Sequence, residues 1–162
     1  MIFKAKNGAS IIERIEVDES EALCQYPAID HALIIVKMED DYLLGWHKWR
    51  DDYETFGGLM DRGENLRECI NRECEEELGI KDMDYEYLGV LHTYMPPGYW
   101  VKEWHEEYGG IYGITLPKTM LSAIEQNRLD REEIGEIAFY SELKRRGEKI
   151  DEINEALLAF YP

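Results

Sequence analysis

A glycine-rich stretch that leads into an acidic helix constrains the fold more than any other part of this sequence. Residues 56–80 read FGGLMDRGENLRECINRECEEELGI. From Glu64 to Leu78 the apolar residues recur at helical spacing, and Gly79 stands where a helix C-cap favours glycine. The stretch therefore predicts a loop, a helix and a second loop, with one stripe of the helix packed against a core.

The predicted helix has two faces of different chemistry. One face is an apolar stripe of residues four apart: Leu66, Ile70, Cys74 and Leu78. On the other, Glu73, Glu76 and Glu77 stand at i, i+3 and i+4, so their carboxylates lie close together. Three such charges destabilise a helix unless a cation lies among them, and Arg72 is four residues before Glu76. Hard oxygen donors at this density suit Mg²⁺ or Mn²⁺.

The rest of the chain mixes strands with helices. Strands are expected at residues 11–17, 31–38, 42–46, 84–94, 108–116 and 134–140, and helices at 118–127 and 151–160. Asp40 and Asp41 form a turn between two of these strands, which predicts a hairpin. The mixture predicts the α+β class, built as a mixed-sheet α/β/α sandwich. At this length, residues 1–162 are expected to form a single domain.

The composition restricts partners and location. The formal net charge of −17 repels polyanions, so no nucleic acid is expected as a partner. A small phosphorylated ligand remains compatible, because bound divalent cations reverse the local sign. The longest apolar run, Ala32 to Val36, is too short to span a membrane, and no signal peptide is evident. Three cysteines give no disulfide framework, so we expect reduced thiols and a cytoplasmic protein.

The segment 58–80 resembles the Nudix box of the Nudix hydrolases. The matching positions are Gly58, Glu64, Arg72, Glu73, Glu76, Glu77, Gly79 and Ile80, at the spacing of the family. The one departure is Cys74, where the family usually has a larger aliphatic side chain. A cysteine there serves as a small buried hydrophobe. Residues 1–25 and 145–162 show no match.

The resemblance implies a Nudix-like fold in which the box forms a loop–helix–loop, and it implies roles for the box residues. Glu73, Glu76 and Glu77 bind the divalent metal, and the carbonyl of Gly58 completes the shell. Arg72 pairs with a core glutamate. The catalytic residues carried over are Glu73, Glu77 and Arg72, and Glu64 is a supporting residue.

The resemblance also implies a further carboxylate from a later loop, acting as ligand or base. Glu103, Glu106 and Glu107 are the candidates, and the sequence leaves the choice among them open. The general base is likewise left open between the box and the later loop.

The implied activity is metal-dependent hydrolysis of a phosphoanhydride (pyrophosphate) bond by attack of water on phosphorus. The substrate class is a small nucleoside di- or triphosphate or a nucleotide sugar, and the sequence does not choose between them. Pro96, Pro97 and Gly98 predict a loop in which Tyr99, Trp100 and Trp104 are candidates for stacking on a nucleobase.

Two other functions are compatible with such a fold. One is a non-catalytic nucleotide-binding or sensor domain, but such domains commonly lose box carboxylates and this chain keeps them. The other is a related isomerase, which needs further acid–base residues that the sequence does not identify. Whether the chain forms a homodimer is left open.

Overall fold

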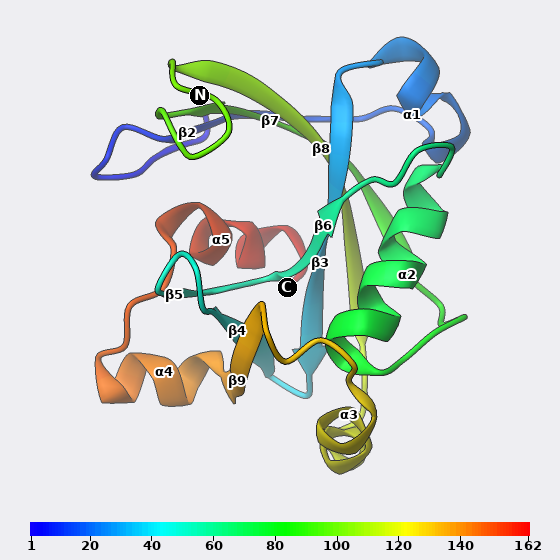
Figure 1. Cartoon of the computed structure of the whole chain (residues 1–162), viewed down its shortest axis with the longest axis vertical. Helices are drawn as coiled ribbons and strands as arrows, with labels where there is room; N and C mark the ends of the chain where they lie inside the picture. The colour runs from blue at the N-terminus through cyan, green and yellow to red at the C-terminus, as the bar shows by residue number, and fades with distance from the viewer.

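A nine-stranded mixed sheet forms the centre of the computed structural model, which describes residues 1–162 (Figure 1). Neighbouring strands follow the order β1 (Phe3–Lys4), β2 (Ser10–Ile15), β7 (Glu86–Met95), β8 (His105–Thr115), β3 (Ile29–Met38), β4 (Asp41–His47) and β5 (Asp52–Glu54). In addition, β6 (Phe56–Leu59) pairs with β3, and β9 (Ile134–Phe139) pairs with β4. β3 and β8 are parallel, and the other strand pairs are antiparallel. The predicted α+β class is confirmed.

Helices cover both sides of this sheet (Figure 1). One side carries α1 (Glu19–Gln25), α2 (Leu66–Leu78) and α3 (Leu121–Asn127), which a 3₁₀ turn at Lys118–Met120 precedes. The other side carries α4 (Tyr140–Arg146) and α5 (Glu152–Leu157), which continues as a 3₁₀ turn at Leu158–Phe160. Each side has its own apolar core, so the molecule is the expected α/β/α sandwich.

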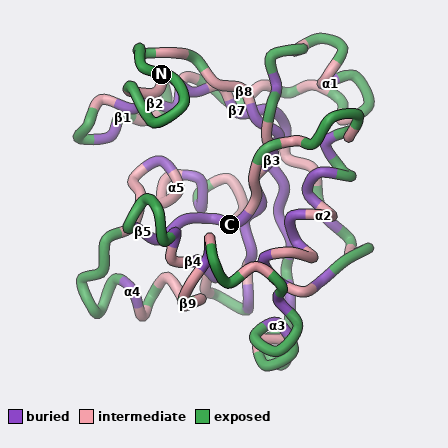
Figure 2. Tube along the Cα trace, in the orientation of Figure 1, coloured by how far each residue is buried: buried purple, intermediate pink, exposed green.

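Strand β3 belongs to both cores. Ile34 points into the core beneath α2, and Ile35 points into the core beneath α5. Most of the trace of β3 and the sheet-facing side of α2 are buried (Figure 2). On one edge, β3 pairs first with β6 through residues 31–34 and then with β4 through residues 36–38. This change of partner separates β6, which leads to α2, from the β4–β5 hairpin.

Helix α2 begins two residues later than the sequence predicts, because Asn65 caps it. The Asn65 side chain accepts a hydrogen bond from the Glu68 amide at 2.8 Å, and the Glu68 carboxylate accepts one from the Asn65 amide at 3.0 Å. This reciprocal pair satisfies two amides that the first turn leaves free. At the other end Gly79 has a φ of 64°, the left-handed conformation that the predicted C-cap requires.

Two short helices were not predicted. α1 buries only Ala22, and α4 buries only Leu143, so neither has an apolar stripe that a sequence pattern reveals. α1 is held instead by Glu19, which accepts two hydrogen bonds from Arg67 at 2.7 and 2.8 Å. No helix is both long enough and apolar enough to cross a membrane.

Candidate active site

Two consecutive glycines bring β6 against both β3 and α2. Gly57 has a φ of 132°, and a Cβ there would lie 2.1 Å from the carbonyl oxygen of Ala32. A Cβ on Gly58 would lie 2.6 Å from Oε1 of Glu73. Only glycine permits this approach at either position. The turn thus places backbone groups of residues 57 and 58 directly beside the carboxylates of α2.

Glu77 is the most deeply placed of the box carboxylates. It is 2% exposed, and its Oε1 accepts a 2.7 Å hydrogen bond from the amide of Gly57. Burial raises the pKa of Glu77 well above its ordinary value, and the Gly57 amide acts in the opposite direction. The charges of Glu73, Glu133 and Asp130 raise this pKa further. A carboxyl in this position gains strongly from a neighbouring positive charge.

Glu73 is also buried, and its pKa is raised to about 7. Burial is the main cause, hydrogen bonding and charge from Arg72 oppose it, and the charges of Glu76 and Glu133 add to it. Glu76 lies at the edge of the cluster, where its side chain is 42% exposed. The three glutamates therefore form a series from the interior to the solvent.

Arg72 connects this series to the loop before the helix. Its guanidinium donates to both oxygens of Glu64 at 2.8 and 3.0 Å, to Glu73 at 2.9 Å and to the Leu59 carbonyl at 2.9 Å. It also lies 3.4 Å from Glu76. The hydrogen bonds from Arg72 lower the pKa of Glu64, with a further contribution from the Asp61 amide. Glu64 thus orients the arginine, and the arginine is the cation that the acidic face requires.

These residues fit a divalent metal by the chemistry of their donors. Glu73, Glu76, Glu77 and the Gly58 carbonyl offer oxygen atoms, which Mg²⁺ and Mn²⁺ prefer. The glycine at position 58 leaves space for the Glu73 carboxylate that any other side chain would fill. No three His, Cys, Asp or Glu side chains are spaced as a preformed metal cluster. The carboxylates are hydrogen-bonded instead to Arg72 and to the Gly57 amide.

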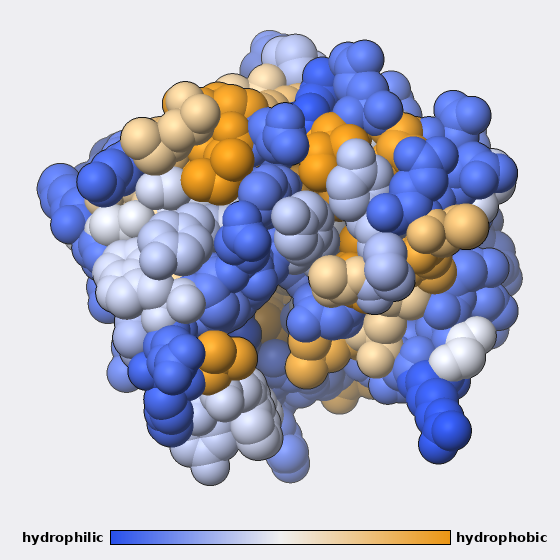
Figure 3. Space-filling model, turned by 90° about the horizontal axis from the view of Figure 1, so that it is seen from above, coloured by the Kyte–Doolittle hydropathy of each residue, from blue (hydrophilic) through white to orange (hydrophobic).

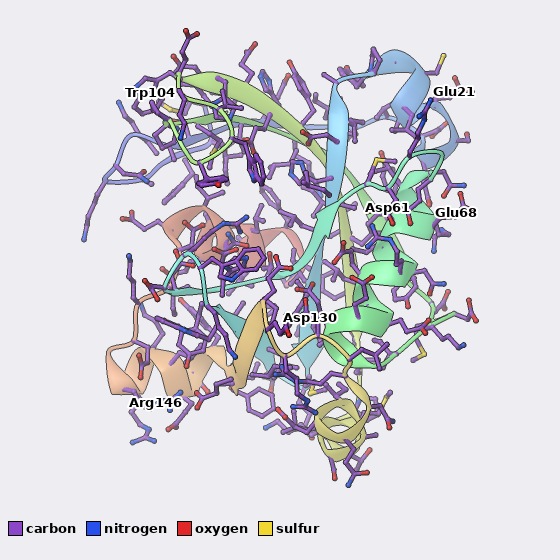
Figure 4. All side chains as sticks on the ribbon, in the orientation of Figure 1. Glu21, Asp61, Glu68, Trp104, Asp130 and Arg146 are labelled. Carbon is purple, nitrogen blue, oxygen red and sulfur yellow. The ribbon has the colours of Figure 1, made fainter.

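A later loop supplies two carboxylates that the sequence analysis did not select. Glu133 and Asp130 lie between α3 and β9, and their charges raise the pKa of Glu77. The amide of Asp130 donates to the carbonyl of Glu76 at 2.7 Å, which fixes this loop to α2. Glu133 Oε1 is hydrogen-bonded to Nε2 of the buried His47 at 3.1 Å. In Figure 4, Asp130 lies between β9 and α2.

The three glutamates selected as later-loop candidates lie elsewhere, on or beside β8. Glu106 is hydrogen-bonded to His92 at 3.0 Å, and Glu107 to His105 at 2.8 Å. The carbonyl of Glu103 accepts a hydrogen bond from His105 at 2.8 Å. The structure therefore pairs these residues with histidines, and it brings Glu133 rather than them to the box.

The aromatic residues at the tip of the β7–β8 hairpin form two pairs. Tyr99 and Trp100 are 79% and 83% exposed and meet edge to face at 4.7 Å between ring centroids. Trp104 stacks on Tyr94 at 5.3 Å and lies against Gly8. In Figure 4, Trp104 lies at the upper left of the molecule and Asp130 near its centre. Seen from above, the surface is largely hydrophilic, with separate apolar patches (Figure 3).

The α/β/α sandwich and the glycine turn before an Arg–Glu helix define the Nudix fold. The family model for the NUDIX domain matches residues 28–152, and the chain belongs to this family. The box on residues 58–80 lies within the matched region, so the predicted resemblance is confirmed.

Known relatives agree with this assignment. The chain is 36% identical to the NAD-capped RNA hydrolase NudC of Photobacterium profundum over 67 residues, which are 40% of this chain and 25% of that protein. It is 32% identical to the ADP compounds hydrolase NudE of Escherichia coli over 89 residues, which are 55% of this chain and 44% of that protein. The matches thus span less than half the length of these curated relatives.

Solved structures share the fold at low sequence identity. The Bacillus subtilis pyrophosphohydrolase BsRppH superposes with a TM-score of 0.62 at 20% identity, over 98% of this chain and 93% of that chain. The NUDIX domain of Shewanella oneidensis NrtR, solved with ADP ribose, gives a TM-score of 0.59 at 13% identity, over 89% and 96% of the two chains.

Proposed function

We propose that this protein is a pyrophosphohydrolase that requires Mg²⁺ or Mn²⁺ and cleaves the phosphoanhydride of a small nucleotide-like substrate. One observation carries the proposal: the box keeps Glu73, Glu76 and Glu77 together, with Glu73 beside Gly58, Glu77 bonded to the Gly57 amide and Arg72 between Glu73 and Glu76. Such a concentration of carboxylates has no other evident use in the fold. The proposed metal ligands are these three glutamates and the Gly58 carbonyl.

The chemistry follows from the charges and proton acceptors of the site. When bound, a divalent cation supplies electrophilic stabilisation of the phosphate oxygens. Glu73 is the proposed general base, because Arg72 holds its carboxylate at 2.9 Å, directly beside Gly58. Glu133 is the second candidate, since His47 orients its carboxylate beside the box. Arg72 and Glu64 position Glu73 through the hydrogen bonds described above.

Water is the proposed nucleophile, and it attacks phosphorus. The two box cysteines are buried, and burial is the main cause that raises the pKa of both thiols. Neither Cys69 nor Cys74 is therefore an activated nucleophile. Hydrolysis in ¹⁸O-labelled water should place the label on a phosphate product. Loss of activity in a folded Cys74→Ala variant would count against direct attack by water.

The charge of the chain favours a small substrate over a capped RNA. The names of the relatives specify NAD-capped RNA and ADP compounds. Both contain a nucleoside diphosphate linkage, but a net charge of −17 opposes the approach of a long polyanion. We therefore propose an ADP-linked compound, such as ADP-ribose or a dinucleotide, as the substrate. The three free thiols support the proposed cytoplasmic location.

A nucleotide panel tests this function. Nucleoside triphosphates, ADP-ribose, NADH and nucleotide sugars are incubated with the protein and Mg²⁺, and release of phosphate or nucleoside monophosphate is measured. The proposal predicts release from ADP-linked compounds. Binding of these compounds without release of any product would support the alternative, a non-catalytic sensor domain.

A further inference from the structure

An exposed tryptophan lies on the turn between β4 and β5. Trp49 is 74% exposed, and its ring meets the His47 ring edge to face, with centroids 5.8 Å apart. A single exposed apolar side chain needs no explanation by itself. The position of this one beside the candidate active site gives it significance.

Two contacts connect the Trp49 turn to the metal site. His47, on which Trp49 rests, is hydrogen-bonded to Glu133 at 3.1 Å. The amide of the next residue, Lys48, donates to the carbonyl of Glu133 at 2.9 Å. Glu133 is the loop carboxylate whose charge acts on both Glu73 and Glu77. The indole thus packs on a histidine that is itself hydrogen-bonded to Glu133, at the rim of the site.

The turn that carries Trp49 is fixed by its own hydrogen bonds. The Asp51 amide donates to the His47 carbonyl at 2.8 Å, and the Arg50 amide lies 3.2 Å from Nδ1 of His47. The Arg50 guanidinium donates to the buried Glu54 at 2.6 Å. A turn held in this way presents the indole with little loss of backbone freedom on binding.

The residues on either side of Trp49 in the sequence are basic, in a chain whose net charge is −17. Lys48 precedes Trp49 and extends past Gly135 at the start of β9. Arg50 follows it and is among the groups near Glu133. A nucleotide presents an aromatic base and anionic phosphates. The exposed indole suits the base and Lys48 suits a phosphate, whereas the Arg50 guanidinium is held by Glu54.

We propose that Trp49 forms the subsite for the nucleobase of the substrate, with the base stacked on the exposed indole and Lys48 directed to the ribose-phosphate. This inference rests on the proposed function, because it places the base relative to the carboxylate site. It also differs from the expectation that Tyr99, Trp100 and Trp104 hold the base. Those three residues lie in the loop between β7 and β8, and Figure 4 shows Trp104 of this loop away from Asp130.

Calorimetric binding of AMP and ribose 5-phosphate in the presence of Mg²⁺ tests the subsite. Base stacking contributes roughly 1–3 kcal/mol, so Trp49→Ala should weaken AMP binding by about 5- to 150-fold. Ribose 5-phosphate lacks a base, and its affinity should not change. Trp49→Phe keeps a stacking ring and should retain most of the AMP affinity. Trp100→Ala tests the rival position: Trp100 is 83% exposed, and a subsite at Trp49 predicts that its loss leaves both affinities unchanged.

The subsite is overturned if wild-type protein does not bind AMP, if Trp49→Ala leaves AMP affinity intact, or if it weakens both ligands equally. It is also overturned if Trp100→Ala, and not Trp49→Ala, causes the loss. Because binding is measured without turnover, a protein that binds AMP through Trp49 but hydrolyses nothing would retain the subsite and refute the hydrolase. Melting temperatures of all variants, which should match the wild type, confirm that each is folded.

Discussion

The amide of Gly57 donates a 2.7 Å hydrogen bond to Oε1 of Glu77, a residue on the following helix. This bond joins the glycine turn of β6 to the acidic face of α2. It satisfies one oxygen of a carboxylate that is 2% exposed. This bond fixes the turn relative to the helix, so the geometry of the box is determined by contacts within residues 56–80.

Replacing the box glutamates should separate activity from stability. Glu73→Gln, Glu76→Gln and Glu77→Gln should each lower kcat by about 10²–10⁴-fold. In metal-free buffer Glu77→Gln should melt at an equal or higher temperature, because a neutral amide avoids the burial of a charge. Glu75→Gln, on the same helix, is the matched control and should retain activity. Intact activity in Glu77→Gln would refute the metal assignment.

Gly58→Ala should impair catalysis through Glu73. The added Cβ would lie 2.6 Å from Oε1 and 2.8 Å from Cδ of Glu73, so this carboxylate must move. Because misplacement by about 1 Å can cost 10²-fold in rate, we expect kcat to fall by about 10- to 100-fold. Gly98→Ala, which has no neighbour near its Cβ, is the control. Equal kcat values for the two variants would contradict the close approach of Gly58 to Glu73.

Glu133→Gln should lower kcat more than Glu107→Gln. The charge of Glu133 acts on Glu73 and Glu77, whereas Glu107 is hydrogen-bonded to His105. A decrease of about 10²-fold is expected for Glu133→Gln if it serves as ligand or base. Glu132→Gln changes the adjacent exposed carboxylate and controls for loop charge. A larger decrease in Glu107→Gln would instead indicate that the further ligand or base is Glu107 on β8.

The box could be predicted because its interactions are local. The cap of Asn65, the ladder of glutamates and the bond from Gly57 to Glu77 all lie within residues 56–80. Their spacing in the sequence determines their positions on a helix and on the turn before it. The fold class was predicted for the same reason, since apolar patterns report the individual strands and helices.

The position of Glu133 near the box could not be predicted in this way. Glu133 approaches the box only because β9 pairs with β4 and because the Asp130 amide is bonded to the Glu76 carbonyl. Both contacts join segments far apart in the sequence. The one local signal was the acidic run before β9, residues 130–133, which resembles an ordinary solvated loop. The resemblance to the family implies only a carboxylate from some later loop, for which Glu103, Glu106 and Glu107 are the candidates in the sequence.

A buried carboxyl pair on β5 should make stability depend on pH. Burial raises the pKa of both Asp52 and Glu54, so the folded state holds protons that the unfolded state releases. The two carboxyls therefore contribute their whole stabilisation below a pH of about 4, the pKa of such groups in the unfolded chain. This contribution to the free energy of unfolding is lost as the pH rises toward their pKa values in the folded protein. Glu54→Gln should remove the Glu54 part of this loss of stability at higher pH, because a glutamine side chain does not ionise.

Urea unfolding between pH 5 and 9 measures the effect. The free energy of unfolding of Glu54→Gln, relative to the wild type, should increase with pH. Glu148→Gln changes an exposed carboxylate and should show a constant difference. A Glu54→Gln difference that is constant or decreases with pH would show that this carboxyl is ionised in the folded protein.

Metal dependence tests the central claim most directly. The protein is treated with EDTA, and the initial rate of hydrolysis of the best substrate in the nucleotide panel is measured as Mg²⁺ is added back. We predict no hydrolysis in EDTA and a rate that rises to saturation with Mg²⁺, since the carboxylates of Glu73, Glu76 and Glu77 supply the ligands of the metal. Hydrolysis at an undiminished rate in EDTA would contradict the account.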